Sequence, residues 1–381
     1  MLLQDIDGSL KNMHIASFYE MALFRTDLDL ARGQVIVTYV HPDDMHHHDR
    51  EKERRNTLHV PLSPTTDGLA RLEICMHNSS TKGYDMGPHF NDWFSARFGF
   101  KVRLAYLGEN SRPVLGSFSP SPSSSAFSVR ARSVLSMLSS SSPTSLLLLV
   151  ILVIGVVLSP SWPFRISLLT LASLIWNTTN AGDQGKGGIF GLIRRLKTMV
   201  SAEQGGSRIT FADCAAYLVA SETSLHDVTA RLRADHIENG NHELAEEEEM
   251  EVTKFRPNIV ISGASTPYEE DFWSELTVNH RGHEPSSSRL MLTANCVRCK
   301  SLNVDYLTGK QAAGPAGTVL KKLMKDRRVD KGARYSPVFG RYGFLAPGGS
   351  KKSNPVVSVG DPVSVSKVAT ERSVFGESVS S

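Results

Sequence analysis

An apolar insertion in the middle of the chain limits its possible folds more than any other feature. Leu146 to Leu158 contain no charged residue, and a second apolar stretch, Ile166 to Trp176, follows two prolines and an arginine. Each stretch is shorter than the roughly 20 helical residues that cross a ~30 Å hydrocarbon core. We therefore expect a proline-broken membrane hairpin at about residues 145–176. The alternative is a buried helical pair inside a soluble domain.

The residues on either side of this hairpin predict a larger insertion, 117–205. The Ser- and Pro-rich residues up to about 144 cannot bury enough apolar area to fold, which is typical of a linker. Gly188 to Val200 places Ile, Leu and Met on one side and Arg and Lys on the other, as in a basic amphipathic helix at a membrane surface. If the flanking segments build one globular unit, both ends of the insertion lie on the same side of the membrane.

The flanking segments predict an α+β fold that is mostly β. Before the insertion we expect strands and one helix at these positions: Gln34 to Val40, Leu69 to His77, Lys101 to Leu107, and the helix Met86 to Phe98. After it we expect the helices Ser224 to Leu232 and Gly317 to Lys325, an acidic loop at Glu246 to Glu249, the strands Asn258 to Ser262, Leu290 to Ala294 and Ser301 to Asp305, and a closing hairpin at Pro355 to Val365. The predicted domains are 1–116 and 206–366, with a disordered tail at 367–381.

Composition excludes several classes of function. The chain has 381 residues, of which 40% are hydrophobic, so it can form a globular core. Its net charge of +3 is too small to predict nucleic-acid binding. Four cysteines are too few for a disulfide scaffold, which favours a reducing compartment, and Met1 to Asp5 lack the pattern of a signal peptide. Without a P-loop or a dinucleotide fingerprint, we expect electrons to come from a partner protein.

Cys296 and Cys299 form the most informative pair of reactive side chains. Their spacing suits half a zinc site, a dithiol redox pair, or a turn that presents one thiolate to a metal. Zinc is disfavoured because Cys75 and Cys214 lie far away, and a thioredoxin-like site is disfavoured because no helix follows. Arg298 would favour a thiolate that binds a soft, high-valent metal. Two inert, buried cysteines remain an alternative.

A set of motifs in fixed order makes the pair more specific. They are Phe255 to Gly263, Tyr268 to Trp273, Cys296 to Cys299 with Val304-Asp305 and Thr308-Gly309, Ser336 to Gly340, and Val359 to Pro362. In these motifs the chain resembles the MOSC domain of the mitochondrial amidoxime-reducing component family, over residues 206 to about 366. Gly83 to Leu107 resembles the end of the MOSC N-terminal β-barrel that precedes this domain. The resemblance thus implies an incomplete N-terminal barrel followed by a MOSC barrel.

The resemblance also implies a cofactor and a reaction. In that family the second cysteine of the pair ligates the molybdenum of a molybdopterin cofactor, and here this position is Cys299. The pterin-phosphate contacts would be made by Arg256, Asn258, Val297, Arg298 and Ser221. The implied activity is the reduction of N-hydroxylated substrates, with electrons from a b-type cytochrome and an NADH-dependent flavoprotein reductase. The implied location is a membrane, such as the mitochondrial outer membrane, with the globular domains facing a reducing compartment.

Elementary chemistry agrees with this assignment, with one departure. Two dithiolene sulfurs and one thiolate leave oxo positions open on the metal, and forked guanidinium donors suit a phosphate. Family members carry a first strand with a Lys-Ser pair, and a later Arg, before the segment that matches Met1 to Ala16. This chain begins after those elements, so we expect an incompletely walled cofactor pocket.

Other readings of the sequence remain open. The MOSC unit could be a carrier of cofactor or sulfur, as in the C-terminal part of molybdenum cofactor sulfurases, or a structural remnant without activity. His46 to His48, with three nearby aspartates, could bind a divalent metal, but a solvated loop is favoured. A basic run could bind the acidic face of a heme protein or could simply be a solvated helix face: Lys321, Lys322, Lys325, Arg327, Arg328, Lys331 and Arg334.

Overall fold

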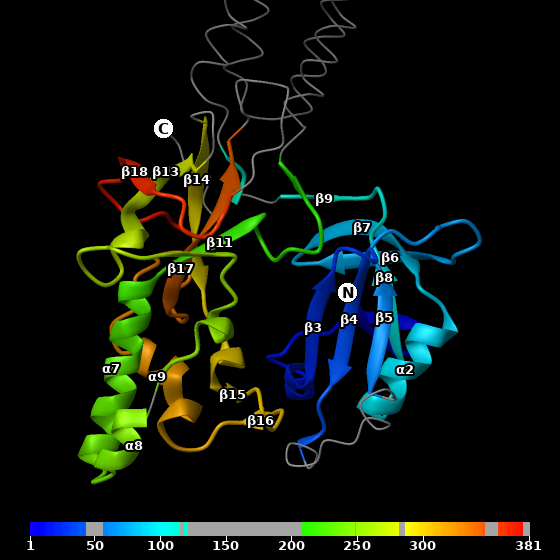
Figure 1. The fold of residues 1–381 in the computed structure, drawn as a ribbon, viewed down its shortest axis with the longest axis horizontal. Helices are drawn as coiled ribbons and strands as arrows, with labels where there is room; N and C mark the ends of the chain where they lie inside the picture. The colour runs from blue at the N-terminus through cyan, green and yellow to red at the C-terminus, as the bar shows by residue number, and fades with distance from the viewer. Residues whose placement is uncertain are drawn as a thin grey trace, which may run out of the picture. The chain divides into compact units, whose positions relative to one another are not determined.

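The computed structural model describes residues 1–42, 56–114, 118–120, 207–247, 249–281, 286–346 and 357–375. The predicted linker, membrane hairpin and amphipathic helix at 121–205 lie outside these residues, as does the His46 to His48 cluster. Within the described ranges, every helix is too short or too polar to cross a membrane. Residues 1–120 and 206–381 together form one compact unit, which is mostly β (Figure 1).

The N-terminal part contains two antiparallel sheets. The five-stranded sheet has the order β2-β1-β8-β7-β6, with β1 (Leu2–Ile6), β2 (Ser9–Asn12), β6 (Arg71–Met76), β7 (Ser79–Asp85) and β8 (Val102–Tyr106). The three-stranded sheet contains β3 (Phe24–Asp29), β4 (Gln34–Tyr39) and β5 (Thr57–Pro61). The strands predicted at 34–40, 69–77 and 101–107 are confirmed within two residues at each end.

One helix packs against these sheets at the predicted position. It is α2 (Pro88–Phe98), which begins with a proline after Gly87 and ends at Gly99 in the left-handed conformation. A proline at the first helical position and a glycine after the last one are favoured signals for the two ends. Phe94 on α2 is buried with Val37, Leu58 and Val102, so the helix closes the core between the sheets.

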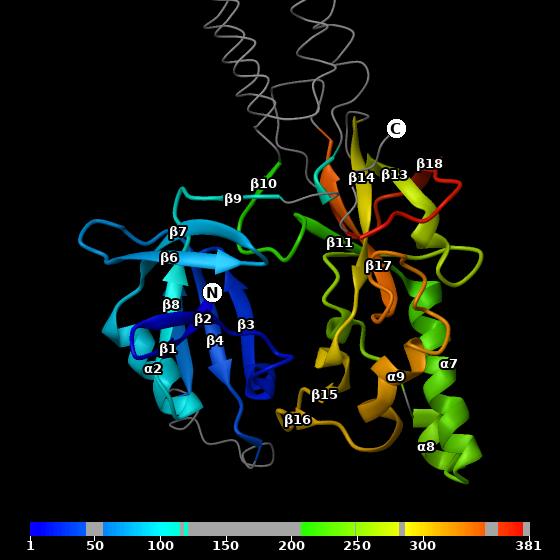
Figure 2. The same cartoon turned by 180° about the vertical axis from the view of Figure 1, so that it is seen from behind.

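The C-terminal part is built on one six-stranded sheet, seen from behind in Figure 2. Its order is β12-β11-β17-β14-β13-β18, with β11 (Tyr217–Ser221), β12 (Ile259–Ile261), β13 (Trp273–His280), β14 (Ser286–Val297), β17 (Val338–Leu345) and β18 (Val363–Val368). Only β11 and β12 pair in parallel among these strands. The shorter elements are η4 (Val252–Phe255), η5 (Glu269–Phe272), η6 (Lys300–Asn303), β15 (Val304–Asp305), β16 (Lys310–Gln311), η7 (Gly314–Thr318) and η1 (Tyr19–Leu23).

Three helices accompany this sheet: α7 (Glu222–Glu238), α8 (His242–Glu247) and α9 (Val319–Leu323). Helix α7 buries Ser224, Val228 and Leu232, which repeat every fourth residue and share one face of the helix. It extends six residues beyond the predicted end, because His236 in the added turns is also buried. The predicted helix at 317–325 is shorter than expected, since its first turn is the 3-10 helix η7.

A short sheet joins the two segments that flank the insertion. β9 (Arg112–Pro113) pairs antiparallel with β10 (Arg208–Ile209), and Val114 N–H donates to the Ser207 carbonyl at 2.9 Å. The buried Arg112 side chain also donates from Nε to the Thr210 carbonyl at 3.1 Å. The described segments on either side of the insertion therefore lie beside each other.

Four expectations need correction. Residues 301–303 form the 3-10 helix η6 instead of a strand, because Leu302 is fully buried and its N–H donates back to the Cys299 carbonyl. The expected hairpin at 355–365 is wrong, since β18 pairs with β13. The acidic loop is partly helical, because α8 reaches Glu247. Residues 367–375, predicted to be a disordered tail, are bound to the domain, with Arg372 paired to the buried Asp271.

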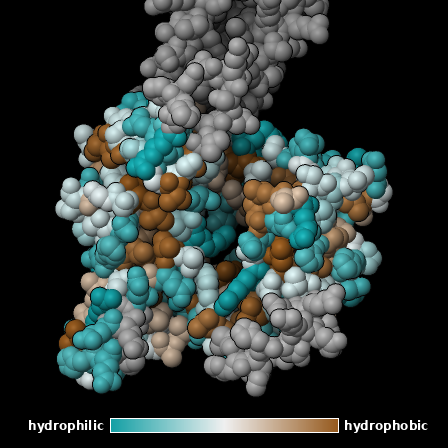
Figure 3. Space-filling model, viewed as in Figure 1, coloured by the Kyte–Doolittle hydropathy of each residue, from teal (hydrophilic) through white to brown (hydrophobic). Residues whose placement is uncertain are grey.

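The surface of the described residues is mixed in character. Several large apolar side chains are exposed, among them Leu30, Val260 and Leu307. Figure 3 shows apolar residues interspersed with polar ones over one face. Isolated exposed apolar residues are normal on soluble domains, so they indicate no binding site by themselves.

Candidate functional site

The two cysteines of the predicted site point to different environments. Strand β14 continues through Cys296, which is 2% exposed and belongs to a core cluster with Ala294 and Tyr342. Val297 pairs with Val338 of β17, and the N–H of Arg298 donates to the Pro337 carbonyl at 2.8 Å. The strand pairing therefore fixes the chain up to the residue before Cys299.

Cys299 is a free and exposed thiol at the start of η6. Its Sγ lies 3.2 Å from Oγ of Ser301, a buried hydroxyl that can donate to a thiolate. Among the described residues, His, Cys, Asp and Glu do not gather in threes as a metal site. With Cys296 buried, the geometry favours a turn that presents one thiol over a dithiol or zinc site.

Arg298 does not present its guanidinium to solvent. The residue is 9% exposed, its Nη1 donates to Cys296 Sγ at 2.9 Å, and its Nη2 donates to the Phe255 carbonyl at 2.8 Å. Its predicted role as a forked donor to a phosphate stays a prediction, and it would require these two hydrogen bonds to be exchanged. In this structure the side chain of Arg298 donates hydrogen bonds to Cys296 and Phe255 inside the protein. Its backbone belongs to the turn that leads to Cys299.

Arg256 and Asn258 line a small cleft of about 130 Å³, together with Asp213 and Tyr342. The Arg256 side chain is 57% exposed, and the residue adopts the left-handed conformation with φ 55° directly after η4. Asn258 is held by Leu218, whose N–H donates to its Oδ1 at 2.8 Å while the Asn258 N–H donates to the Leu218 carbonyl. The cleft thus combines an accessible cation with a fixed amide.

An aspartate that sequence reasoning missed faces this cation. The carboxylate of Asp213 lies 3.7 Å from His77 and 3.7 Å from Arg256. The hydrogen bond from His77, followed by the charge of Arg256, lowers the pKa of Asp213 against the effect of burial. No sequence signal predicts this contact, because His77 belongs to the turn between β6 and β7, far away in the chain.

Tyr306 is a second residue that the sequence did not identify. Its hydroxyl is buried and has no hydrogen-bond partner within the described ranges. Burial raises its pKa, and the charges of Arg256 and Arg298 oppose that shift. A buried hydroxyl without a partner costs about 1–3 kcal/mol, so a bound ligand with an acceptor atom would recover this cost.

Ser221 does not line this cleft. It is the last residue of β11, it is fully buried, and its hydroxyl has no partner among the described side chains. Its side chain would have to become accessible before it could contact a cofactor. The structure therefore places Arg256 and Asn258 in one cleft, which Ser221 does not line. The turn from Val297 to Cys299 is linked to the residue before Arg256 by the hydrogen bond from Arg298 to the Phe255 carbonyl.

These groups fit an anionic metal cofactor in part. An exposed thiol, an exposed guanidinium and an unpartnered hydroxyl are donors that a molybdopterin could use. The Arg298 side chain is the exception, since Nη1 and Nη2 each donate to a protein atom, although its buried Nε has no partner within the described ranges.

Comparisons with known proteins place this site in a recognised domain. Residues 206–364 match the MOSC domain family. The chain is 33% identical to human mitochondrial amidoxime-reducing component 1 over 160 residues, which is 41% of this chain and 38% of that protein. The mouse protein of the same name is 30% identical over 171 residues, 45% of this chain and 42% of that protein. The molybdenum cofactor sulfurase of Emericella nidulans is 36% identical over 88 residues, which is 22% of this chain and 10% of that protein. The chain thus spans less than half the length of these relatives.

Proposed function

Because residues 206–364 form a MOSC domain homologous to the amidoxime-reducing components, we propose that this chain binds a molybdenum cofactor and acts as an oxidoreductase. The observation that carries the proposal is the exposed thiol of Cys299, which follows the buried end of β14. Its substrate class would be N-hydroxylated compounds, since the relatives are named as amidoxime-reducing components. The whole activity is a proposal, since the similarity covers 38% of the human protein.

The residues of the site would serve as metal ligand, hydrogen-bond donors and phosphate-binding cation. When bound, the cofactor supplies a molybdenum centre that can accept an oxygen atom and pass on electrons. Cys299 would be its protein ligand, and Ser301 would donate a hydrogen bond to the ligating sulfur. Arg256 would pair with the cofactor's phosphate in exchange for Asp213, and Tyr306 would donate to an acceptor on the ligand.

A partner protein would supply the electrons. We propose a b-type cytochrome and an NADH-dependent flavoprotein reductase, as the resemblance implies. The basic run at 321–334 supports such docking only in part, because two of its members are buried and paired: Lys322 with Asp235, and Arg327 with Asp271. The five exposed members, which could contact an acidic surface, are Lys321, Lys325, Arg328, Lys331 and Arg334.

Membrane attachment through residues 145–176, at a mitochondrial membrane, also stays a proposal. It is supported by the apolar sequence and by the pairing of β9 with β10, which places the described segments on either side of the insertion beside each other. Protease mapping should find residues 120 and 200 on the same face of the membrane. Cleavage of the two positions from opposite faces would contradict the hairpin.

Metal analysis tests the binding step. Wild-type protein, purified from a host that makes the cofactor, should contain molybdenum and pterin, and Cys299→Ser should lose most of the molybdenum. Cys75→Ser is the matched control, because Cys75 is also an exposed, free cysteine but lies in the N-terminal sheet. Equal molybdenum content in both variants would contradict the assignment of Cys299.

Reduction of benzamidoxime with a reconstituted electron chain then tests the enzyme activity. The second candidate is a carrier of cofactor or sulfur, favoured by the similarity to a molybdenum cofactor sulfurase. A carrier would hold molybdopterin without reducing benzamidoxime. A protein that holds no molybdenum at all would contradict both candidates.

A further inference from the structure

A short segment after strand β18, residues 369–375, is bound to the domain by buried polar groups. We call this segment the strap. It lies beyond the residues that match the MOSC family, which end at 364. Arg372 of the strap nevertheless donates from Nε to the fully buried Asp271 at 2.8 Å, and the Ala369 N–H donates to the Phe272 carbonyl at 2.7 Å. The strap is therefore held on the domain by specific contacts.

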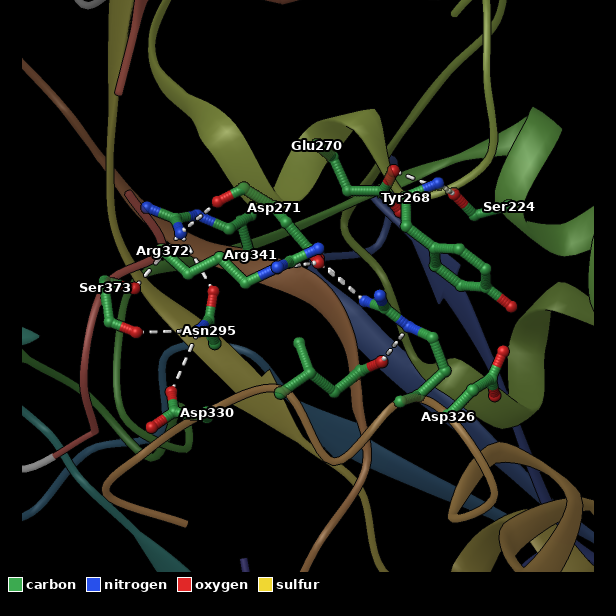
Figure 4. Close-up of polar contacts among 12 residues, drawn as sticks. Ser224, Tyr268, Glu270, Asp271, Asn295, Asp326, Asp330, Arg341, Arg372 and Ser373 are labelled. Carbon is green, nitrogen blue, oxygen red and sulfur yellow. Dashed lines mark hydrogen bonds and ion pairs between the residues drawn. The ribbon is translucent and has the colours of Figure 1, made fainter. Parts of the chain in front are cut away.

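Asn295 connects the strap to the strand that carries the cysteine turn. This residue is fully buried on β14, and its Nδ2 donates both to the Ser373 carbonyl at 2.9 Å and to Asp330 Oδ2 at 2.8 Å (Figure 4). Asp330 in turn accepts the N–H of Phe375 at 2.9 Å. Because Asn295 comes four residues before Cys299, the strap is bound to the strand end from which that thiol emerges.

The ring of Phe375 packs against the core behind the cysteine turn. That core cluster includes Cys296 and Phe118, and the rings of Phe375 and Phe118 meet edge to face with centroids 4.9 Å apart. The Phe118 carbonyl also accepts a hydrogen bond of 2.8 Å from Thr293 Oγ1 on β14. The strap thus contacts both β14 and the last described residues before the insertion.

Release of the strap would not leave buried charges without partners. Asp271 would keep its two hydrogen bonds from Arg327, and Asn295 would keep its bond to Asp330. Every residue of the strap is itself exposed or half-buried. A surface segment whose departure orphans no buried charge opens at a lower free energy than the core does. The strap can therefore leave a domain that stays folded.

We propose that the strap opens and closes on the folded domain and that, when closed, it positions the end of β14 from which Cys299 emerges. Asn295 and Phe375 are then positioning residues, because they act through the strand and not by touching a cofactor. A metal ligand needs such support, since its own geometry depends on the groups that hold it. The positioning part rests on the proposed function, whereas the opening of the strap does not.

Hydrogen exchange of backbone amides in the full chain, resolved by mass spectrometry, measures the opening. The N–H groups of Ala369 and Phe375 are hydrogen-bonded in the closed strap. We expect peptides that cover the strap to exchange more slowly than an unfolded peptide and faster than those of β14 and β17. Exchange of the strap only at the rate of global unfolding would overturn the proposal, as would exchange without any protection.

Two variants open the strap from opposite sides. Phe375→Ala removes one aromatic pair, which should raise the exchange of the strap roughly two- to tenfold. Gly332→Ala acts from the domain, because a Cβ on Gly332 would collide with the Phe375 carbonyl. Phe375→Tyr keeps the ring and should retain the wild-type rate. Glu371→Gln is the matched control, since Glu371 is an exposed residue of the same strap.

Exchange in the cysteine turn measures the positioning. The Arg298 N–H donates to the Pro337 carbonyl and the Leu302 N–H donates to the Cys299 carbonyl, so both amides report on the order of the turn. In Phe375→Ala and Gly332→Ala, exchange at 298–302 should rise together with that of the strap, while the N-terminal sheet stays unchanged. An unchanged turn beside an open strap would overturn the positioning, as would an equal rise in every peptide.

Molybdenum content then relates the strap to the proposed function. Loaded with limiting cofactor, Phe375→Ala and Gly332→Ala should lose part of their molybdenum, whereas Phe375→Tyr and Glu371→Gln should match the wild type. Full molybdenum content in both opening variants would overturn the positioning of the cofactor ligand and leave the proposed function intact. A strap that opens as expected in a wild-type protein without molybdenum would support the strap and contradict the proposed function.

Discussion

Asp271 is the buried charge whose loss should be most costly for folding. It lies in η5, it is fully buried, and it accepts two hydrogen bonds of 2.8 Å from Arg327 and one of 2.8 Å from Arg372. Figure 4 shows Asp271 beside Arg372. Figure 4 also shows Ser373 directed at Arg341, in the same network. The change Asp271→Asn keeps the shape of the side chain and removes its charge.

The expected cost follows from the exposure of the two arginines. The Arg327 side chain is 5% exposed, so it would stay buried without a counter-ion, and such a loss typically costs about 3–5 kcal/mol. The Arg372 side chain is 34% exposed, so solvent screens it and its own pair is worth about 1 kcal/mol or less. Asp271→Asn should therefore destabilise the protein several times more than Arg372→Met.

Urea unfolding followed by circular dichroism measures both free energies of unfolding. The slope of the free energy against urea should not change, because neither variant alters the surface that unfolding exposes. The double variant Asp271→Asn, Arg327→Met should cost less than the two single changes added together, since their charges interact. A cost below about 1 kcal/mol for Asp271→Asn, in the range of an ordinary surface change, would refute this reasoning.

Three further predictions concern other buried groups. Burial raises the pKa of Glu270 above 4.5, so the folded state holds the carboxyl proton more tightly than the unfolded state does. The free energy of unfolding should therefore fall as pH rises through the pKa of Glu270 in the folded protein. Urea midpoints measured against pH should show this decrease in the wild type and a smaller decrease in Glu270→Gln. Gly340 has φ 80° and an added Cβ would lie 2.8 Å from the Val219 carbonyl, so Gly340→Ala should lower the melting temperature by the equivalent of at least about 1–3 kcal/mol. Tyr268→Phe removes the 2.5 Å bond from its hydroxyl to Asp227 and should cost about 1.5–3 kcal/mol in the same urea assay, whereas an unchanged midpoint would show that this bond is not formed.

Local sequence pattern predicted the regular elements better than the connections between them. The strands β4, β6 and β8 and the helix α2 were found because alternation, β-branched residues and end signals act over a few neighbours. Residues 301–303 were misread as a strand, because the burial of Leu302 that favours a 3-10 turn depends on a core built by distant helices. The partner of β18 was missed for the same reason.

The candidate site shows a similar division. The motifs identified Cys299, Arg256 and Asn258, and the structure places Cys299 at the surface and the other two in one cleft. The structure alone revealed Asp213 beside Arg256, because its neighbour His77 comes from the other side of the insertion. It also showed that Ser221 is fully buried and does not line the cleft.

The sequence by itself determined that two cysteines sit three apart at the end of a strand, within motifs of a MOSC domain. The sequence could not distinguish the roles of Cys296 and Cys299, since it does not show which of the two thiols is buried. The tertiary structure decided that Cys296 lies inside against Arg298 and that Cys299 lies outside. Burial is the physical reason, because it depends on which distant strands and helices cover a residue, and no local pattern contains that information.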